Sequence, residues 1–199
     1  MRKMVLVGIA LLFVGGGLWM ACARGDDAAP AAAKAEAEKA PVQHGYIGPA
    51  SCQGCHKSAA KGDQYGKWKA GPHAQAYNTL LNEESIKIAK EKGLKVPPSE
   101  APECLKCHET AYNVKPELLG AKFNKTEGVG CESCHGPAAD WKLVHMKDVK
   151  KAMTLGMIVP DKAVCVQCHN EESPTFKGFD YEKALAVIAH PNPQKAKKE

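Results

Sequence analysis

The sequence predicts a mainly α-helical protein with extensive loops, and three observations support this. The five-residue pattern Cys-x-x-Cys-His occurs four times in 199 residues. Apolar and polar residues alternate nowhere for more than four residues, so a strand signal is missing. Aromatic residues make up only 6% of the composition. A chain with so few large side chains needs something else to fill its core.

The repeated pattern identifies what fills the core. C-x-x-C-H is the attachment signal for c-type haem, in which the two thiols bind the porphyrin and the histidine ligates the iron. We therefore predict four covalently bound c-type haems as the core of a small multihaem cytochrome. The attachment sites of the first to fourth motifs would be Cys52 and Cys55, Cys104 and Cys107, Cys131 and Cys134, and Cys165 and Cys168. The proximal iron ligands would be His56, His108, His135 and His169.

Other uses of paired cysteines fit the pattern less well. A single C-x-x-C is also typical of a thioredoxin-like redox pair or of half a zinc site. Neither needs a histidine directly after the second cysteine, yet all four copies have one. The first cysteines of successive motifs are 52, 27 and 34 residues apart. This unequal spacing excludes a solenoid with a constant repeat length.

Three segments carry a helical pattern. Residues 73–92 have apolar side chains at helical spacing, and Gly93 is well placed to end that helix. Residues 131–151 are predicted to be mostly helical, although Gly136-Pro137 interrupts them. A final short helix is predicted over 181–189, where His190-Pro191 would close it.

Residues 1–23 are predicted to be an export leader, because a short basic start precedes a long uncharged stretch. Three outcomes are open. The sequence before Cys22 resembles a lipobox, which would make this ninth cysteine a lipidation site. Ala21-Cys22-Ala23 also fits a cleavage site that releases a soluble protein, and the leader could remain as an uncleaved anchor. The rest divides into an Ala/Lys/Glu-rich linker (24–43), a tetrahaem domain (44–191) and a basic tail (192–199).

Four histidines lie outside the motifs, and we predict them as distal iron ligands: His73, His145, His190 and His44. Four irons each need one more ligand to be bis-histidine and low-spin, so the count matches. For a lone histidine a surface position would be the simpler explanation. No pattern in the sequence indicates which of the four belongs to which haem. A haem with two histidine ligands can move electrons but has no open site for a substrate.

Several stretches around the motifs are similar to those of one known family. The most specific is Gly-Val-Gly-Cys-Glu-Ser-Cys-His-Gly-Pro at 128–137. Others are Tyr46-Ile47-Gly48, Gly71-Pro72-His73-Ala74 after Trp68, Glu103 with the second motif, and Phe179-Asp180-Tyr181 leading to His190-Pro191. With these, residues 46–191 resemble the tetrahaem cytochrome c-554 family of exported multihaem cytochromes.

The resemblance implies haems packed in alternating stacked and edge-on pairs, with His73, His145 and His190 as distal ligands. Some members of the family keep one haem five-coordinate, a feature that a fourth spare histidine puts in question. Related small tetrahaem cytochromes assemble into extracellular filaments, where a histidine of one subunit ligates a haem of the next. His44 could have that role.

The expected function is electron transfer in an extracytoplasmic respiratory chain, not enzymatic catalysis. The partners would be a quinol-linked or periplasmic donor and a terminal reductase or extracellular acceptor. The protein would lie in the periplasm or at the cell surface, as a membrane-anchored lipoprotein. Two alternatives are a small nitrogen-oxide reductase with one open haem and a filament-forming cytochrome. The formal net charge of +5 comes from scattered lysines and gives no argument for nucleic-acid binding.

Overall fold

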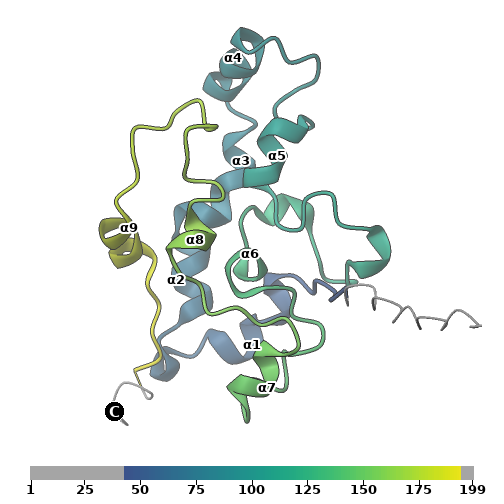
Figure 1. Ribbon diagram of the computed structural model, residues 1–199, viewed down its shortest axis with the longest axis vertical. Coiled ribbons are helices and arrows are strands. Elements are labelled where there is room, and N and C mark those ends of the chain that lie inside the picture. The colour runs from purple at the N-terminus through teal and green to yellow at the C-terminus, as the bar shows by residue number, and fades with distance from the viewer. Residues whose placement is uncertain (1–42, 194–199) are drawn as a thin grey trace, which may run out of the picture. The chain divides into compact units, whose positions relative to one another are not determined.

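The computed structural model describes residues 43–193, which form short helices joined by long loops (Figure 1). The predicted leader with Cys22, nearly all of the linker 24–43 and most of the tail 192–199 lie outside the described residues. Within residues 43–193, no helix is both long enough and apolar enough to cross a membrane.

The predicted fold class is confirmed: the chain is mainly α with extensive loops. The α-helices are α1 (Gln53–His56), α2 (Gln64–Ala70), α3 (Ala76–Thr79), α4 (Glu83–Glu91), α5 (Pro102–His108), α6 (Cys131–His135), α7 (Val149–Met153), α8 (Lys162–Cys165) and α9 (Tyr181–Ile188). Short 3-10 helices are η1 (Pro49–Ser51), η2 (Ala59–Lys61), η3 (Pro72–Gln75), η4 (Pro116–Leu118) and η5 (Lys125–Glu127). Residues 43–193 contain no strand, and Tyr46 and Leu119 form an isolated bridge.

The helices are short because the sequence caps them at close intervals. Five begin after an aspartate or asparagine whose side chain accepts a hydrogen bond from a backbone N–H of the first turn. These caps are Asp63, Asn82, Asp148, Asp161 and Asp180. Helix α5 instead begins with Pro102, whose missing N–H costs nothing at that position. Three of the four haem motifs lie on α1, α5 and α6, and the fourth begins at Cys165, the last residue of α8.

The predicted helix over 73–92 is interrupted. Residues 72–75 form η3 because Pro72 occupies its first position, and α3 ends at Thr79. Asn82 is extended and its side chain accepts a hydrogen bond from the Ser85 N–H, which starts α4 as a separate helix. Gly93 has a φ of 71° and ends α4 as predicted.

The other two helical predictions also differ in length. Residues 131–151 are helical in pieces, because α6 ends at Gly136, whose φ is 78°. A Cβ at Gly136 would lie 2.2 Å from the carbonyl oxygen of Gly156, so only glycine fits this close approach. The final helix, α9, covers Tyr181–Ile188 and agrees with the prediction over 181–189.

Side chains alone build only a small core. The buried apolar residues of the described chain are mostly alanines: Ala74, Leu80, Ala89, Ala101, Ala138, Trp141 and Ala152. One cluster joins Ala138, Trp141 and Ala152, with Ile47, Val144, Leu155 and Met157 packed against it. This sparse packing agrees with the expectation that side chains are not the main filling of the interior.

Candidate functional site

Three of the spare histidines each face a histidine of a motif. The ring centroids of His56 and His145 are 5.9 Å apart, those of His73 and His169 are 6.0 Å apart, and those of His135 and His190 are 6.1 Å apart. Bonds from a metal to an imidazole nitrogen are about 2 Å long. Two imidazoles on opposite sides of one ion therefore have their centroids about this far apart. The spacing fits an iron between the two rings of each pair.

Hydrogen bonds at Nδ1 fix the orientation of three histidine rings, His108, His135 and His190. The Nδ1 atom of His108 lies 2.6 Å from the Ala76 carbonyl oxygen, that of His135 lies 3.3 Å from the Ile158 oxygen, and that of His190 lies 2.8 Å from the Ile188 oxygen. A carbonyl oxygen only accepts, so Nδ1 carries the proton in each case. Nε2 then keeps the lone pair that a metal needs.

The environment also keeps three of these histidines neutral. Burial lowers the pKa of His56, His73 and His135 below the ordinary value. The histidine that each of them faces lowers its pKa further. The Gln64 side chain raises the pKa of His56, but burial outweighs it. Neutral imidazole is the form that ligates a metal. The site therefore favours the ligand form before any ion is bound.

His44 and His108 do not form a fourth ring pair. The Nδ1 atom of His44 lies 2.6 Å from a carboxylate oxygen of Asp140, and its ring lies against Gly156. His108 lies against the Ala76 carbonyl and the Thr79 hydroxyl. Among residues 43–193, no ring contact joins His44 to a histidine of a motif. The prediction of His44 as a fourth distal ligand therefore has no support from this geometry.

The motif thiols show which motifs are neighbours. Interaction with the Cys131 thiol lowers the pKa of the Cys52 thiol, and interaction with the Cys52 thiol raises the pKa of the Cys131 thiol. Burial, with the nearby Cys107 thiol, raises the pKa of Cys168 to about 12. Burial and the charge of Cys165 raise the pKa of Cys134. The first motif thus lies beside the third, the third beside the fourth, and the fourth beside the second.

Two buried donors near the first motif lack partners. Trp141 Nε1 and His145 Nδ1 are buried without a hydrogen bond, and the two rings meet edge-on with centroids 5.4 Å apart. Haem carries two carboxylates, which are acceptors for such donors. The eight motif cysteines are all free of disulfide bonds, as thioether attachment requires. In the described part of the chain, no three His, Cys, Asp or Glu side chains cluster as a zinc site would need. The free thiols and the unpaired donors fit haem.

Glu132, the second residue of the third motif, holds that motif in place. Its carboxylate is buried and accepts hydrogen bonds from the backbone N–H groups of Ile47, Gly48 and Ala138, at 2.8–3.1 Å. Burial raises its pKa, and the three backbone bonds oppose that shift. The sequence places Glu132 in the family-like stretch but gives no sign of this role, because two of its three partners, Ile47 and Gly48, are backbone groups far away in the chain.

A second network joins the second and third motifs. The Thr110 hydroxyl donates to the Gly128 carbonyl and accepts from the Gly130 N–H. The Val129 N–H donates to the His73 carbonyl, and Trp68 Nε1 donates to the Val129 carbonyl. Phe179 also stacks on His169 with centroids 4.8 Å apart. Sequence reasoning missed the roles of Thr110 and Phe179, since neither lies at a distinctive spacing from a motif.

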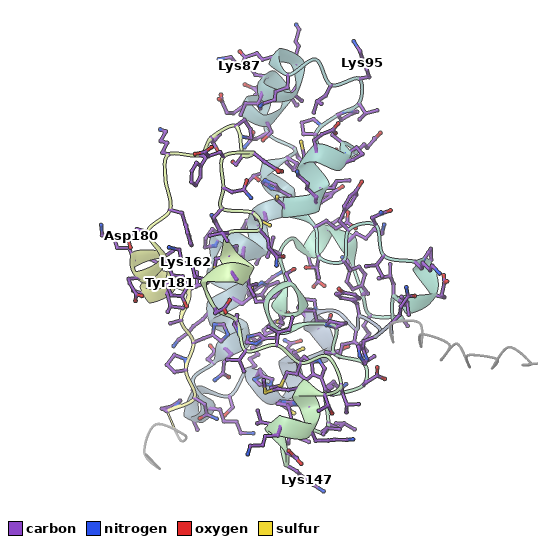
Figure 2. The ribbon with its side chains drawn as sticks, viewed as in Figure 1. Lys87, Lys95, Lys147, Lys162, Asp180 and Tyr181 are labelled. Atoms are coloured by element: carbon purple, nitrogen blue, oxygen red, sulfur yellow. The ribbon has the colours of Figure 1, made fainter. Side chains whose placement is uncertain are left out.

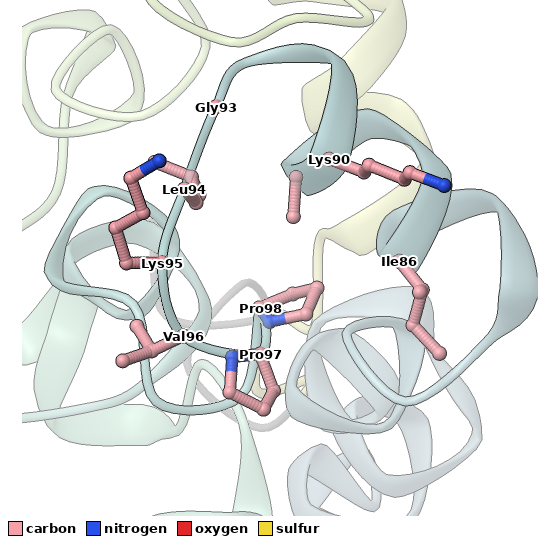
Figure 3. Close-up of a pocket in the computed structure, with 9 residues that line it drawn as sticks. Ile86, Lys90, Gly93, Leu94, Lys95, Val96, Pro97 and Pro98 are labelled. Atoms are coloured by element: carbon pink, nitrogen blue, oxygen red, sulfur yellow. The ribbon is translucent and has the colours of Figure 1, made fainter.

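A shallow pocket lies away from these residues. It is formed by α4 and the loop 93–98, with Ile86, Lys90 and Pro97 around it (Figure 3). No predicted haem-binding residue lines this pocket. It is therefore not part of the candidate haem site.

Comparisons with known proteins agree with this site. The family described as cytochrome c554 and c-prime matches residues 51–136, which contain the first three motifs. Cytochrome c-554 of Nitrosomonas europaea is 28% identical in an alignment of 151 residues that covers 67% of this chain and 61% of that protein. The chain therefore spans less than two thirds of that relative. The solved reduced state of cytochrome c554 from Nitrosomonas europaea shares the fold, with a TM-score of 0.50 and 22% identity over 79% of this chain and 84% of that one. These findings confirm the predicted resemblance to the tetrahaem cytochrome c-554 family, with four covalently bound c-type haems.

Proposed function

We propose that this protein is an electron carrier in which three haems have two histidine ligands. The pairs are His56 with His145, His135 with His190, and His169 with His73. The observation that carries the proposal is the spacing of these three ring pairs, 5.9–6.1 Å between centroids. With both axial positions filled, such a haem exchanges electrons and has no place for a substrate.

The chain's part in this function is to hold, orient and shield the haems, which themselves supply the redox chemistry. Haems attached to neighbouring motifs, the first with the third, the third with the fourth and the fourth with the second, would pass electrons from one to the next. Carbonyl groups keep Nδ1 of His108, His135 and His190 protonated. Burial keeps His56, His73 and His135 neutral.

A second function rests on the unpaired position of His108. In the described chain no spare histidine faces it, so the iron of the second motif would have an open axial site. An open haem can bind a small molecule, as a nitrogen-oxide reductase requires. Alternatively, a histidine of another subunit could fill the site, as in a filament. We place both below the carrier function because three of the four haems have a complete ligand pair.

The location and partners follow from the sequence. The leader 1–23 supports export to the periplasm or cell surface, and Cys22 supports attachment as a lipoprotein. The partners would be redox proteins of a respiratory chain, with a quinol-linked or periplasmic donor and a reductase or extracellular acceptor on the other side.

The test is low-temperature electron paramagnetic resonance on the oxidised, haem-loaded protein and on four histidine variants. His73→Met, His145→Met and His190→Met should each change the low-spin signal of one haem. His44→Met is the matched control and should leave all signals unchanged. Nitric oxide should alter only the signal of the second-motif haem.

Two outcomes would count against the proposal. A change of ligation in His44→Met would mean that the fourth spare histidine is a ligand after all. Unchanged spectra in the other three variants would mean that the ring pairs do not hold iron.

A further inference from the structure

One surface next to the first motif combines exposed apolar side chains with unpaired lysines. We call it the lysine-rimmed patch: Leu143, Met146, Val149 and Met153, with Lys147, Lys150 and Lys151 between them along the chain. Leu143 is 68% exposed, Met146 60% and Met153 50%, which is high for apolar residues. The described chain forms ion pairs elsewhere, but none of them includes these three lysines. Figure 2 shows Lys147 extending from the chain beside α7.

Two apolar residues of the patch, Leu143 and Met146, lie on the side of their turn that faces away from His145. Hydrogen bonds from the Val144 and His145 N–H groups to the Trp141 carbonyl give residues 141–147 a helical turn. Residues three and four apart share one face of such a turn. Trp141, Val144 and His145 thus point inward, and Trp141 lies in the core cluster. Leu143, Met146 and Lys147 point the other way, away from the face that carries His145.

The patch is nevertheless close to the first motif. His145, on the inner side of the turn, faces His56. Lys142, on the same turn, is near enough to the Cys52 thiol that its charge lowers that thiol's pKa. The patch lies on two segments, the turn 141–147 and helix α7. Both contribute to one core cluster, with Trp141 from the turn and Ala152 from α7. A molecule bound at Leu143 and Met146 would therefore contact the same turn that carries His145, the proposed distal ligand of the first haem.

Resting on the proposed carrier function, we propose that the lysine-rimmed patch is the docking surface for an acidic redox protein that exchanges electrons with the first haem. An apolar centre within a ring of charge is the make-up of a protein interface, and the lysines would steer an acidic partner to it. A second copy of this chain is excluded as the occupant of a self-paired patch, because like charges would meet. One electron passes from the reduced partner to the ferric haem, which becomes ferrous, and no atom is transferred.

The patch differs from the other lysine-rich surface of the chain. Helix α4 carries Lys87, which pairs with Glu91, and its first turn holds Glu83 and Glu84. Figure 2 shows Lys87 and Lys95 beside α4, a different part of the chain from Lys147. No predicted haem ligand lies on α4. This surface supplies a matched control for charge reversal.

The test measures stopped-flow reduction of the full, haem-loaded protein by a reduced plant-type ferredoxin, an acidic iron–sulfur protein used as the probe. Lys147→Glu/Lys150→Glu should slow the second-order rate on the order of tenfold at low ionic strength and weaken its dependence on salt. Lys90→Glu/Lys95→Glu, on α4 and the loop that follows it, carries the same change of net charge and should alter the rate by less than about twofold. Met146→Ser should lower the rate without changing the salt dependence. Unchanged haem spectra confirm that each variant is folded.

The results separate the patch from its alternatives. Equal slowing in both double variants would show an effect of net charge alone, and an unchanged rate in the patch variant would exclude docking there. Loss of binding to phosphatidylglycerol vesicles with an unchanged ferredoxin rate would assign the patch to a membrane and overturn the proposal. If dithionite and oxygen failed to cycle the haems, the carrier function itself would fail, whatever the patch does.

Discussion

The second and third motifs carry the same five-residue pattern but lie in different surroundings. The third is held by the buried carboxylate of Glu132, which accepts three backbone N–H groups, and its histidine faces His190. The second ends in His108, which faces no spare histidine in the described chain. An exposed ion pair, Lys106–Glu172, links it to the residues after the fourth motif.

The difference shows that the motif fixes attachment but not ligation. Both motifs supply two thiols and one imidazole, so both bind haem in the same way. The residue that could supply the second axial ligand of each iron depends on the segments packed around its motif. Within the described chain, the third motif contains a buried carboxylate, Glu132, whereas the five residues of the second motif contain none. Breaking these contacts one at a time tests the comparison.

The largest effect is expected from Glu132→Ala. Removing the carboxylate leaves the N–H groups of Ile47, Gly48 and Ala138 without an acceptor. A buried donor without a partner costs about 1–3 kcal/mol, so the variant should lose at least about 3 kcal/mol of unfolding free energy. Guanidinium unfolding of the haem-loaded protein, followed by circular dichroism, measures this.

Glu103→Ala is the control for this variant, because Glu103 is the carboxylate of α5 directly before the second motif. It is exposed, and no hydrogen bond or ion pair found in the described chain involves its side chain. Its unfolding free energy should stay within about 0.5 kcal/mol of the wild type. Equal losses in the two variants would mean that the third motif has no special anchor.

A smaller effect is expected from Thr110→Val, which cuts the link between the two motifs. The variant keeps the shape of the side chain but loses the hydroxyl that bridges Gly128 and Gly130. The loss should be about 2 kcal/mol, because the buried Gly130 N–H is left without an acceptor. Thr110→Ser retains the hydroxyl and should lose clearly less. If Val and Ser variants unfolded at the same denaturant concentration, the hydroxyl bridge would have no role in stability.

Much of this architecture could be predicted from sequence because it depends on local pattern. The motif fixes haem number and attachment within five residues, and caps and glycines such as Gly93 act within one turn. The prediction of one continuous helix over 73–92 was wrong at Asn82. There a local hydrogen bond from the Ser85 N–H to the Asn82 side chain starts a separate helix, against the apolar periodicity.

The ligand pairs and anchors could not be predicted, because they join residues far apart in the chain. His145 faces His56 across 89 residues of sequence, counted as 145 minus 56, and Glu132 bonds the backbone of Ile47, 85 residues away. His44 matched the tally of ligands, yet it contacts Asp140. Counting residues gives the number of possible ligands, whereas only the packing decides which side chain reaches an iron.

Trp141→Phe tests the inner side of the first haem and should change its potential more than the protein's stability. Phenylalanine keeps the edge-on contact with His145 but removes the unpartnered Nε1–H. If that N–H serves a haem carboxylate, its loss leaves more negative charge near the iron, so one midpoint potential should fall while the low-spin signals persist. Trp68→Phe, whose Nε1–H serves the Val129 carbonyl, is the control. A potentiometric titration in which both variants shift alike, or neither shifts, would contradict this role.

The smallest effect is expected from Glu172→Ala, which removes the ion pair beside the second motif. Solvent screens the pair, because the Lys106 side chain is 46% exposed and that of Glu172 is 69% exposed. The hydrogen bond from Lys106 lowers the pKa of Glu172 below its ordinary 4.5. Any stabilisation is therefore present above pH 4.5 and is lost as the pH falls through the lowered value. At pH 7 the denaturation midpoint and the spectrum of the second haem should not change. A clear loss of stability at pH 7, absent at pH 3, would show that the second motif has an anchor comparable to Glu132, and the contrast between the two motifs would disappear.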